Sequence, residues 1–457
     1  MKFPLLIVGL FTATLGLAQP APVAQTPPMG WTSHMALQPQ ALESEVRLNA
    51  DYMAQNLSNH GWQYVLVDYS WAYPNPPEDN GGNPNQSRLA NGTYVPLLNM
   101  DAHGRLLPDP RKFPSSKDGQ GLRPLASYLH GLGLKFGLHV MRGIPRQAVW
   151  AKTPILGTDG ITADQIADTV NVCPWLNHMY GVDMRKPGAQ EYYNSLLELY
   201  GQWNVDYLKF DDMGLPGNQP VYHKDEVEAV RKAIDELRRP IIFSVAPAQP
   251  FDSSAHLREQ ANLFRISNDA LSNWEQLKKQ FDAGAQWAMV ASAGHWPDAG
   301  RLPLGWRPKR NGADNVPSET FTDAEQRTRM TLWCMLKSPL LIDGNLPDCT
   351  PFTASLLTND EGLAVNQEAT NARPLSRTDD IAIWISDAAD GQTKNVAIFN
   401  LSDESRPVTL TLSDVGIPKK ANIRDVWGKA YKGQFKKTFT HQLAAHDAVL
   451  LRVAPVQ

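Results

Sequence analysis

The alternation of apolar runs with helical patterns along most of the chain is the feature that most limits its fold. Short runs rich in β-branched and aromatic residues, bounded by polar or turn residues, predict buried strands, and segments with apolar residues at helical spacing separate them. Strands are predicted at residues 29–34, 64–71, 134–141, 207–213, 240–246, 263–269, 287–293 and 339–343. Strand–helix units repeated about eight times in order predict a (β/α)8 TIM barrel over residues 19–372.

The pattern changes near residue 373. From there to residue 457, short segments rich in β-branched residues, several with period-two alternation, are separated by Gly, Asp and Pro. This predicts a C-terminal antiparallel β-sandwich. The sandwich carries few candidate catalytic groups, so we expect a structural or docking role, with a separate carbohydrate-binding module as the alternative.

The N-terminus has the pattern of a cleavable leader. Lys2 precedes an apolar stretch over residues 5–17, and the small residues Gly16 and Ala18 flank Leu17 at a cleavage site, so residues 1–18 are predicted to be a signal peptide. We therefore expect a secreted or periplasmic protein. No later stretch is apolar enough to predict a membrane span.

Composition and cysteine count limit the partners and cofactors. A formal net charge of -4 without a long basic run argues against nucleic acid. The three cysteines, Cys173, Cys334 and Cys349, allow at most one disulfide and leave its pairing open. No Cys/His spacing resembles a zinc site and no glycine fingerprint for a dinucleotide is present, so we expect neither metal nor cofactor.

Acids and bases lie toward the carboxyl ends of the predicted strands, which point at one shared pocket in a barrel. They are Asp68, His139, Lys209, Asp211, Asp212, Arg265, Asp269 and Asp298. Several carboxylates with a lysine, an arginine and aromatic residues suit sugar chemistry, in which two carboxyl groups flank the glycosidic bond. Two adjacent acids, as at positions 211 and 212, are also common in an ordinary polar turn.

Two of these acids stand out as a catalytic pair. Lys209 and Asp211 are two residues apart and so leave the same face of a strand, where an ammonium group would keep the aspartate ionised. If Asp269 is the proton donor, its pKa has to be raised, and we expect repulsion from Asp211 to raise it until Asp211 is esterified.

Seven motifs give the chain a resemblance to a known family. They are Pro28-Met-Gly-Trp31, Tyr64-Val-Leu-Val-Asp68, Leu134-Lys-Phe-Gly-Leu-His139, Tyr207-Leu-Lys-Phe-Asp211, Arg265-Ile-Ser-Asn-Asp269, Gly294-His-Trp-Pro-Asp298 and Ser338-Pro-Leu-Leu-Ile342. In this order they resemble glycoside hydrolase family 27, the melibiase family of α-galactosidases and α-N-acetylgalactosaminidases. The resemblance implies a retaining mechanism with Asp211 as nucleophile, Asp269 as general acid/base and no metal.

The departures from the family pattern concern the substrate. The family has two consecutive acids that hold the sugar's 4- and 6-hydroxyls, whereas here Asp68 is followed by Tyr69, and His34 lies where a Trp often occurs. In the family, the loop after the fifth strand distinguishes substrates by the substituent on C2 of the sugar. In this chain the loop residues, 244–248, are small, which leaves room for an N-acetyl group. The substrate-binding residues expected are Trp31, Asp68, Tyr69, His139, Lys209, Ala246, Ala248, Arg265 and Asp298.

Two arginines after the third strand have two possible roles. Arg142 and Arg146 either replace lost sugar contacts or pair with surface acids.

The sequence thus predicts a secreted exo-glycosidase that removes terminal α-galactosyl residues from a carbohydrate substrate. The alternatives within the family are an α-N-acetylgalactosaminidase, for which Ala246 and Ala248 leave room, and a β-L-arabinopyranosidase, whose sugar lacks the C6 group that Tyr69 would meet. An alternative of a different class is a sugar-binding barrel without catalytic activity. The presence of both Asp211 and Asp269 argues against it.

Overall fold

The computed structural model describes residues 22–37, 41–73, 86–88, 94–215, 221–269, 273–305 and 321–456. The predicted signal peptide lies outside these residues. Eight parallel strands form one curled sheet in the order β14-β13-β12-β9-β5-β2-β1-β15. Their bounds are β1 Met29–Thr32, β2 Tyr64–Val67, β5 Lys135–Met141, β9 Tyr207–Asp211, β12 Ile242–Val245, β13 Leu263–Arg265, β14 Trp296–Asp298 and β15 Leu340–Ile342.

The two edges of this sheet meet just beyond β14. Leu302 forms a parallel bridge with Ile342, and its N–H donates to the carbonyl of Leu341 at 2.7 Å. This contact joins the chain after β14 to β15 and confirms the predicted (β/α)8 barrel.

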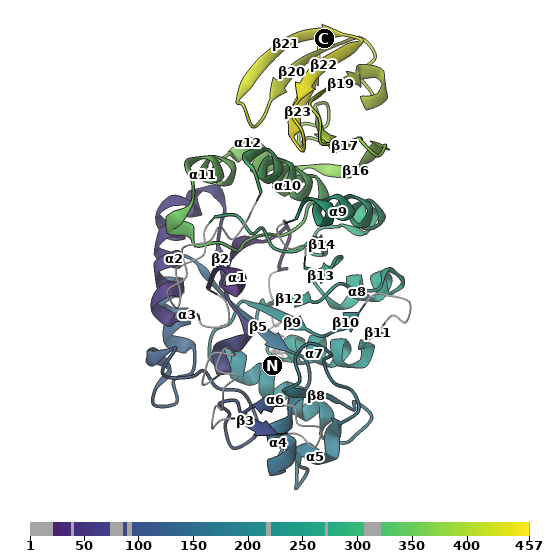
Figure 1. The fold of residues 1–457 in the computed structure, drawn as a ribbon. Coiled ribbons are helices and arrows are strands. Elements are labelled where there is room, and N and C mark those ends of the chain that lie inside the picture. The colour runs from purple at the N-terminus through teal and green to yellow at the C-terminus, as the bar shows by residue number, and fades with distance from the viewer. Residues whose placement is uncertain are drawn as a thin grey trace, which may run out of the picture.

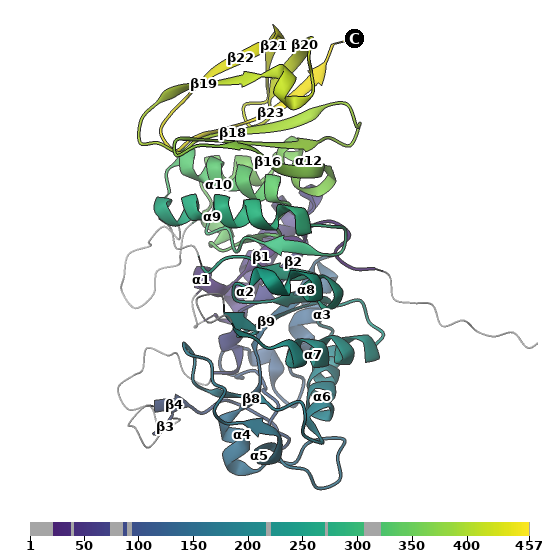
Figure 2. The ribbon, with the colours of Figure 1, turned by 90° about the vertical axis from the view of Figure 1, so that its right-hand side faces the viewer.

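Helices surround the sheet (Figures 1 and 2). Local sequence sets their starts: the side-chain oxygen of Asn273 accepts the N–H of Gln276 at the start of α9, and Thr322 and Glu325 form a capping box at the start of α10. The α-helices are α1 His34–Leu37, α2 Glu43–Asn56, α3 Arg123–Gly131, α4 Arg146–Ala151, α5 Ala163–Ile166, α6 Ala189–Gln202, α7 Lys224–Glu236, α8 Ser254–Gln260, α9 Trp274–Trp287, α10 Asp323–Leu336, α11 Pro351–Leu357 and α12 Asp360–Glu368.

One predicted strand is wrong. Residues 287–293 do not form a strand, because α9 continues to Trp287 and a 3-10 turn, η6, covers Ala288–Val290. Burial there follows helical spacing: Trp287 and Val290 are buried, whereas Met289 is 91% exposed. The seventh barrel strand is β14, which starts at Trp296.

The barrel strands alternate between two apolar layers. An inner cluster consists of Tyr64, Leu66, Tyr207, Ile242, Leu263, Trp296 and Leu341. The intervening strand residues, such as Leu208 and Phe210, belong to the large cluster that the helices share. Because side chains alternate between faces, the inner cluster shows which strand residues face the barrel interior.

Within the described ranges of the chain, seven short strands lie in the loops between the barrel strands and helices. They are β3 Gln86–Arg88, β4 Tyr94–Pro96, β6 Ile144–Pro145, β7 Ala167–Asp168, β8 Met179–Val182, β10 Gly214–Leu215 and β11 Val221–Tyr222.

In the part of the chain that the structure describes, no helix has both the length and the apolar character to cross a membrane. Cys173, Cys334 and Cys349 are all free thiols, so the open question of pairing is answered.

The C-terminal part is the predicted antiparallel sandwich, and its first strand starts close to residue 373. One sheet has the order β16-β17-β18-β23-β20-β21 and the other pairs β19 with β22. The bounds are β16 Thr370–Arg377, β17 Ile381–Asp387, β18 Lys394–Asn400, β19 Arg406–Thr411, β20 Lys420–Asp425, β21 Ala430–Lys436, β22 Thr438–Leu443 and β23 Ala448–Pro455. Val396 and Ile398 on β18 face the sandwich core.

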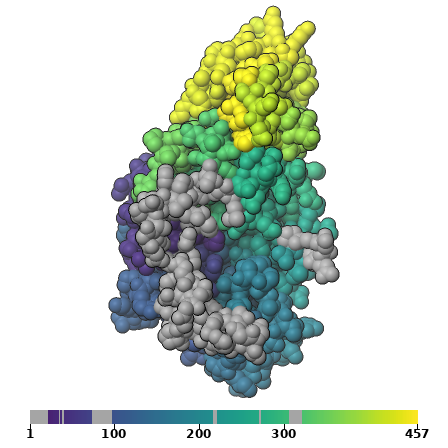
Figure 3. Space-filling model, in the orientation of Figure 1, coloured from purple at the N-terminus to yellow at the C-terminus, as the bar shows by residue number. Residues whose placement is uncertain are grey.

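The other face of the six-stranded sheet packs on the barrel helices. Trp384, Ala397 and Phe399 belong to the barrel's core cluster, and the ring of Phe399 meets Phe281 of α9 edge-on at 4.9 Å. The sandwich therefore forms one end of the molecule, continuous with the α9–α10 layer (Figures 2 and 3).

Candidate active site

Inward-facing side chains at the carboxyl ends of β2, β5 and β9 form the centre of the candidate site. Asp68 follows Leu66 by two residues, and Lys209 and Asp211 follow Tyr207 by two and four, so all three share the face of the inner cluster. In the sheet register, His139 pairs with Lys209 and Met141 pairs with Asp211. The strand alternation thus brings four predicted site residues together.

Asp211 is a mostly buried carboxylate with two hydrogen-bond donors. Its Oδ2 lies 3.0 Å from Nε2 of His139, and its Oδ1 accepts the N–H of Asp212 at 2.9 Å. Burial raises the pKa of Asp211, but the hydrogen bond from His139, together with the charges of His139 and Lys209, outweighs it and lowers this pKa to about 2. The side chain is therefore ionised at neutral pH, as a nucleophile requires.

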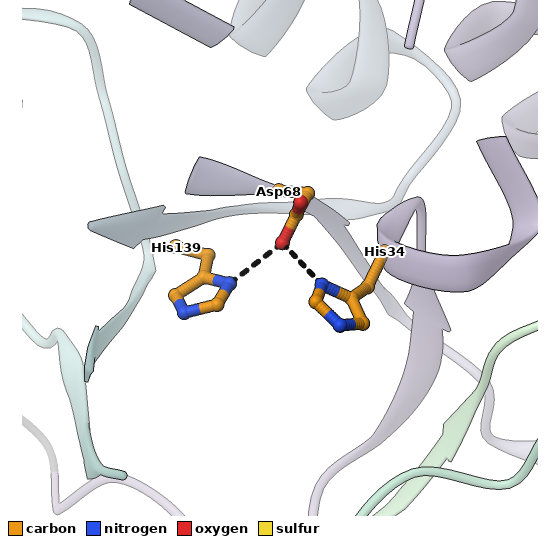
Figure 4. A group of neighbouring side chains, drawn as sticks. All are labelled: His34, Asp68 and His139. Atoms are coloured by element: carbon orange, nitrogen blue, oxygen red, sulfur yellow. Dashed lines mark hydrogen bonds and ion pairs between the residues drawn. The ribbon is translucent and has the colours of Figure 1, made fainter. Parts of the chain in front are cut away.

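Asp68 anchors two histidines (Figure 4). Its Oδ1 lies 2.7 Å from Nδ1 of His34 and 2.8 Å from Nδ1 of His139. Burial raises the pKa of Asp68, but the two histidines outweigh it and hold this pKa far below its ordinary range. Asp68 is 2% exposed, so the network fixes its orientation at the bottom of the site.

The same three residues are the group that could hold a metal ion. Among the described residues, the ligand atoms of His34, Asp68 and His139 lie within 4.8 Å of one another. A metal needs an unprotonated nitrogen from each histidine. Here both Nδ1 atoms contact one ionised carboxylate oxygen, a geometry that places a proton on each. The observed arrangement is therefore a hydrogen-bonded network.

Asp269 lies beyond the end of β13 between two guanidinium groups. Its Oδ1 accepts a hydrogen bond from Arg265 at 3.0 Å, and its Oδ2 lies 3.1 Å from Arg301. We expected repulsion from Asp211 to raise the pKa of Asp269, and this is wrong. Burial does raise it, but Arg265 and Arg301, with smaller effects from His34 and Lys209, hold the pKa of Asp269 well below its ordinary range. The side chain is still 46% exposed and so accessible to a ligand.

Arg265, Arg301 and Asp298 form the wall behind Asp269. Arg265 pairs in register with Asp298 on β14, whose Oδ1 accepts the N–H of Gly300 at 2.7 Å. Arg301 also binds Asp343, at 2.6 Å, just after β15. Asp298 is 3% exposed and lies on the inner face, two residues after Trp296.

Tyr69 closes the site beside Asp68. Its ring meets the His139 ring edge-on at 5.4 Å, and it packs with Cys173 and Met141. Burial raises the pKa of Tyr69, and the charges of Asp68 and Asp211 raise it further, so the phenol stays neutral. A bulky ring thus occupies the position after Asp68 where the family resemblance places a second acid.

Ala246, Ala248 and Trp31, which were also predicted to contact the substrate, expose almost no surface. Ala246 and Ala248, just after β12, are each 1% exposed, and the Ala246 N–H donates to the carbonyl of Phe210. Trp31 is fully buried with Met29 in the outer layer, and its indole N–H donates to the Gly344 carbonyl at 2.7 Å. The structure does not bring Trp31 to the residues around Asp211.

The two arginines of uncertain role do not line the site. Arg142 is buried and binds Asp212 at 2.7 Å and Glu226 at 2.5 Å, so its partners are buried acids, not surface ones. Arg146 lies over the ring of Tyr180 at 4.5 Å. Arg142 instead supports Asp212, which has a left-handed φ of 63° and directs its N–H to Asp211.

Two residues of the site were not assigned from the sequence. In the sequence, His34 stands out only as a departure from the family pattern, and no motif points to Arg301. The available signal was position, because each follows a barrel strand end by two or three residues.

The two candidate catalytic carboxylates, Asp211 and Asp269, are both affected by the charge of Lys209. Asp211 ends β9 and Asp269 follows β13, so both acids lie at the carboxyl end of the barrel, and the charge of Lys209 lowers the pKa of both. Such a pair can supply one attacking carboxylate and one proton-transfer group on opposite sides of a glycosidic bond.

Comparisons with known proteins agree with this chemistry. Residues 180–368 match the family model described as "Alpha galactosidase A", and residues 378–453 match the "Alpha galactosidase C-terminal beta sandwich domain". An α-galactosidase of Coffea arabica is 26% identical over 94% of this chain and 94% of its own length. That of Cyamopsis tetragonoloba is 25% identical over 95% and 87%.

Solved structures include more similar chains. A family 27 β-L-arabinopyranosidase of Geobacillus stearothermophilus is 43% identical, covers 95% of this chain and 97% of its own, and has a TM-score of 0.87. A Bacillus halodurans chain provisionally assigned as an α-N-acetylgalactosaminidase is 37% identical over 96% and 100%, with a TM-score of 0.82. These matches over nearly the full length, with both domain models, show that this chain belongs to glycoside hydrolase family 27.

Proposed function

We propose that this glycosidase prefers terminal β-L-arabinopyranosides. The observation that carries the proposal is Tyr69, whose half-buried ring stands beside Asp68 and His139. The family resemblance assigns this position to an acid that binds the 6-hydroxyl of galactose. β-L-Arabinopyranose matches α-galactose at the other ring carbons but lacks C6, so we expect it to avoid a clash between a hydroxymethyl group and the Tyr69 ring. The 43% identical Geobacillus enzyme is a β-L-arabinopyranosidase, and a variant of it has been solved with arabinose.

The proposed mechanism is a double displacement. A carboxylate oxygen of Asp211 attacks the anomeric carbon while Asp269 gives its proton to the departing glycosidic oxygen, which leaves a glycosyl ester on Asp211. Asp269 then removes a proton from water as the water attacks the same carbon, and Asp211 is released as the carboxylate. Configuration is retained because the carbon is inverted twice.

The ion pairs of Asp269 impose a condition on this mechanism. In the free enzyme, Arg265 and Arg301 favour its ionised form. Asp269 can donate a proton only if substrate binding weakens at least one of these contacts or excludes the water around them. Since the carboxylate is 46% exposed, a leaving-group oxygen can approach it from the open side.

An α-galactosidase is the second candidate. The curated relatives are α-galactosidases, although their identity to this chain is only 24–26%. An N-acetylgalactosaminidase has weaker support here, because Ala246 and Ala248 are both buried and expose almost no surface to a C2 substituent.

A panel of three 4-nitrophenyl glycosides tests the glycone. We expect the highest kcat/KM on the β-L-arabinopyranoside, and Tyr69→Ala should raise the ratio of α-galactoside to arabinopyranoside rates by roughly 10-fold or more, since one carbon group in a pocket changes binding by about 1–3 kcal/mol. A dominant α-galactoside rate in the unmodified enzyme would overturn the proposed glycone. Asp211→Asn should abolish turnover with an unchanged circular dichroism spectrum, which separates a catalyst from a sugar-binding barrel.

We also propose that the protein is exported. The support is the leader pattern of residues 1–18 alone. Mass spectrometry of the protein from a culture supernatant or periplasmic extract should find an N-terminus near Gln19; an intact N-terminus in the cytoplasmic fraction would contradict export.

A further inference from the structure

His139 lies between two carboxylates. Its Nδ1 is 2.8 Å from Oδ1 of Asp68, and its Nε2 is 3.0 Å from Oδ2 of Asp211. The ring is 2% exposed, so water does not supply alternative partners on either side. Turning the ring by 180° would place its carbons against both oxygens, and the two contacts therefore fix its orientation.

The number of protons follows from these contacts. An ionised carboxylate only accepts hydrogen bonds, and a neutral imidazole carries one N–H. A neutral His139 could therefore donate to Asp68 or to Asp211, but its other nitrogen would direct a lone pair at an anionic oxygen. Both contacts are attractive only when both ring nitrogens carry a proton.

The surrounding charges are consistent with an imidazolium. His139 faces Asp68 just after β2, Asp211 and Lys209 on β9, His34 on α1 and the neutral Tyr69 on the 3-10 helix Tyr69–Ala72. His34 needs only one proton for its single contact with Asp68. With a charged His139, two carboxylates are then balanced by one imidazolium and one ammonium.

We infer that His139 carries both ring protons in the resting enzyme and holds the nucleophile Asp211 in place with a charged hydrogen bond. His139 is thus a positioning residue, which transmits the fixed orientation of Asp68 to Asp211. Its role for catalysis rests on the proposed nucleophile, whereas its protonation does not.

Nuclear magnetic resonance of the full chain with labelled histidine tests the protonation directly. The chain has 11 histidines, and His139→Gln identifies the signal of interest as the one that disappears, with His34→Asn as the matched variant for the neighbouring ring. At pH 7 we expect both nitrogens of His139 to show the imidazolium signature. A neutral signature in either tautomer would overturn the inference.

Two substitutions separate the two contacts. The amide nitrogen of Gln can reach the position of Nε2 and donate to Asp211, whereas that of Asn replaces Nδ1 and donates to Asp68 only. We expect kcat/KM to fall on the order of 10-fold in His139→Gln and 100-fold in His139→Asn, since each variant loses one hydrogen bond to a carboxylate but only His139→Asn loses the one to the nucleophile Asp211. The opposite order would mean that His139 serves Asp68 alone.

The acid limb of the pH profile of kcat/KM distinguishes a charged His139 from one that only supports the local structure, because loss of a purely structural contact would not shift this limb. Both variants lack the positive charge, so Asp211 should take up a proton more easily and the acid limb of kcat/KM should shift to higher pH in both. An unmoved limb would contradict the inference. An imidazolium signal in a chain that hydrolyses none of the glycosides would instead refute the proposed function and leave the protonation of His139 standing.

Discussion

Replacement of Arg142 should show how much the buried carboxylates of Asp212 and Glu226 depend on its charge for the stability of the fold. Its side chain is 1% exposed and donates to the Asp212 carboxylate at 2.7 Å, to the Asp212 carbonyl at 2.7 Å and to Glu226 at 2.5 Å. In Arg142→Met both carboxylates lose their cation. Breaking a buried ion pair costs about 3–5 kcal/mol, and we expect a loss in this range in the free energy of unfolding at pH 7.

The loss should depend on pH with a definite sign. Burial already raises the pKa of Asp212 and of Glu226, while Arg142 lowers both. A carboxyl whose pKa is higher in the folded chain contributes stability that is present at low pH and is lost as pH rises through the folded-state pKa. Without Arg142 these pKa values rise further, so the deficit should shrink from pH 7 to pH 5, by about 1.4 kcal/mol per pH unit for each carboxyl held protonated.

Urea unfolding followed by circular dichroism and tryptophan fluorescence at pH 5 and pH 7 measures both quantities. Arg146→Met is the matched control, because it removes another buried guanidinium from the same segment, one that lies over Tyr180. A deficit below about 1 kcal/mol, or one that is the same at both pH values, would refute the assigned role of Arg142.

Three further changes test other parts of the molecule. Arg301→Gln removes one of the charges that lower the pKa of Asp269, so the alkaline limb of kcat/KM should move to higher pH; a shift to lower pH would contradict the observed ion pair. Phe399→Ala should lower the free energy of unfolding by about 3–5 kcal/mol, because the ring is fully buried between sandwich and barrel, and a loss under 1 kcal/mol would mean a loosely docked module. A thiol reagent should titrate three cysteines at once in denaturant but react slowly with native Cys173 and Cys334, whose pKa burial raises to about 12; fewer than three thiols would reveal a disulfide.

Most of the site that could be predicted from the sequence follows from the alternation of side chains between the two faces of a strand. The spacing of Lys209 and Asp211 placed both on one face, and the inner cluster with Tyr207 confirms it. The same rule applied to β1 would have separated Trp31 from the site, because Met29 and Trp31 share one face and Gly30 and Thr32 the other. The family motif pointed to Trp31, whereas the alternation pointed away from it.

Pairing between distant segments could not be predicted. Sequence position shows that His34, Asp68 and His139 each lie at or near the carboxyl end of a strand, but not that one carboxylate oxygen contacts both rings. The same holds for Asp269 with Arg301 and for Arg142 with Glu226, which is 84 residues away. The wrong strand at residues 287–293 has a different cause, since a short apolar run suits a helix end as well as a strand.

The ion pairs also explain how two similar carboxylates could take different roles. In the free enzyme both Asp211 and Asp269 are held ionised, the first by His139 and Lys209 and the second by Arg265 and Arg301. The donors of Asp211 are a buried ring and a main-chain N–H, which a sugar cannot displace. Asp269 is half-exposed, and its guanidinium partners have other acids to bind, Asp298 near Arg265 and Asp343 beside Arg301. On the proposed mechanism, therefore, substrate binding can free Asp269 to take up a proton while Asp211 remains the nucleophile.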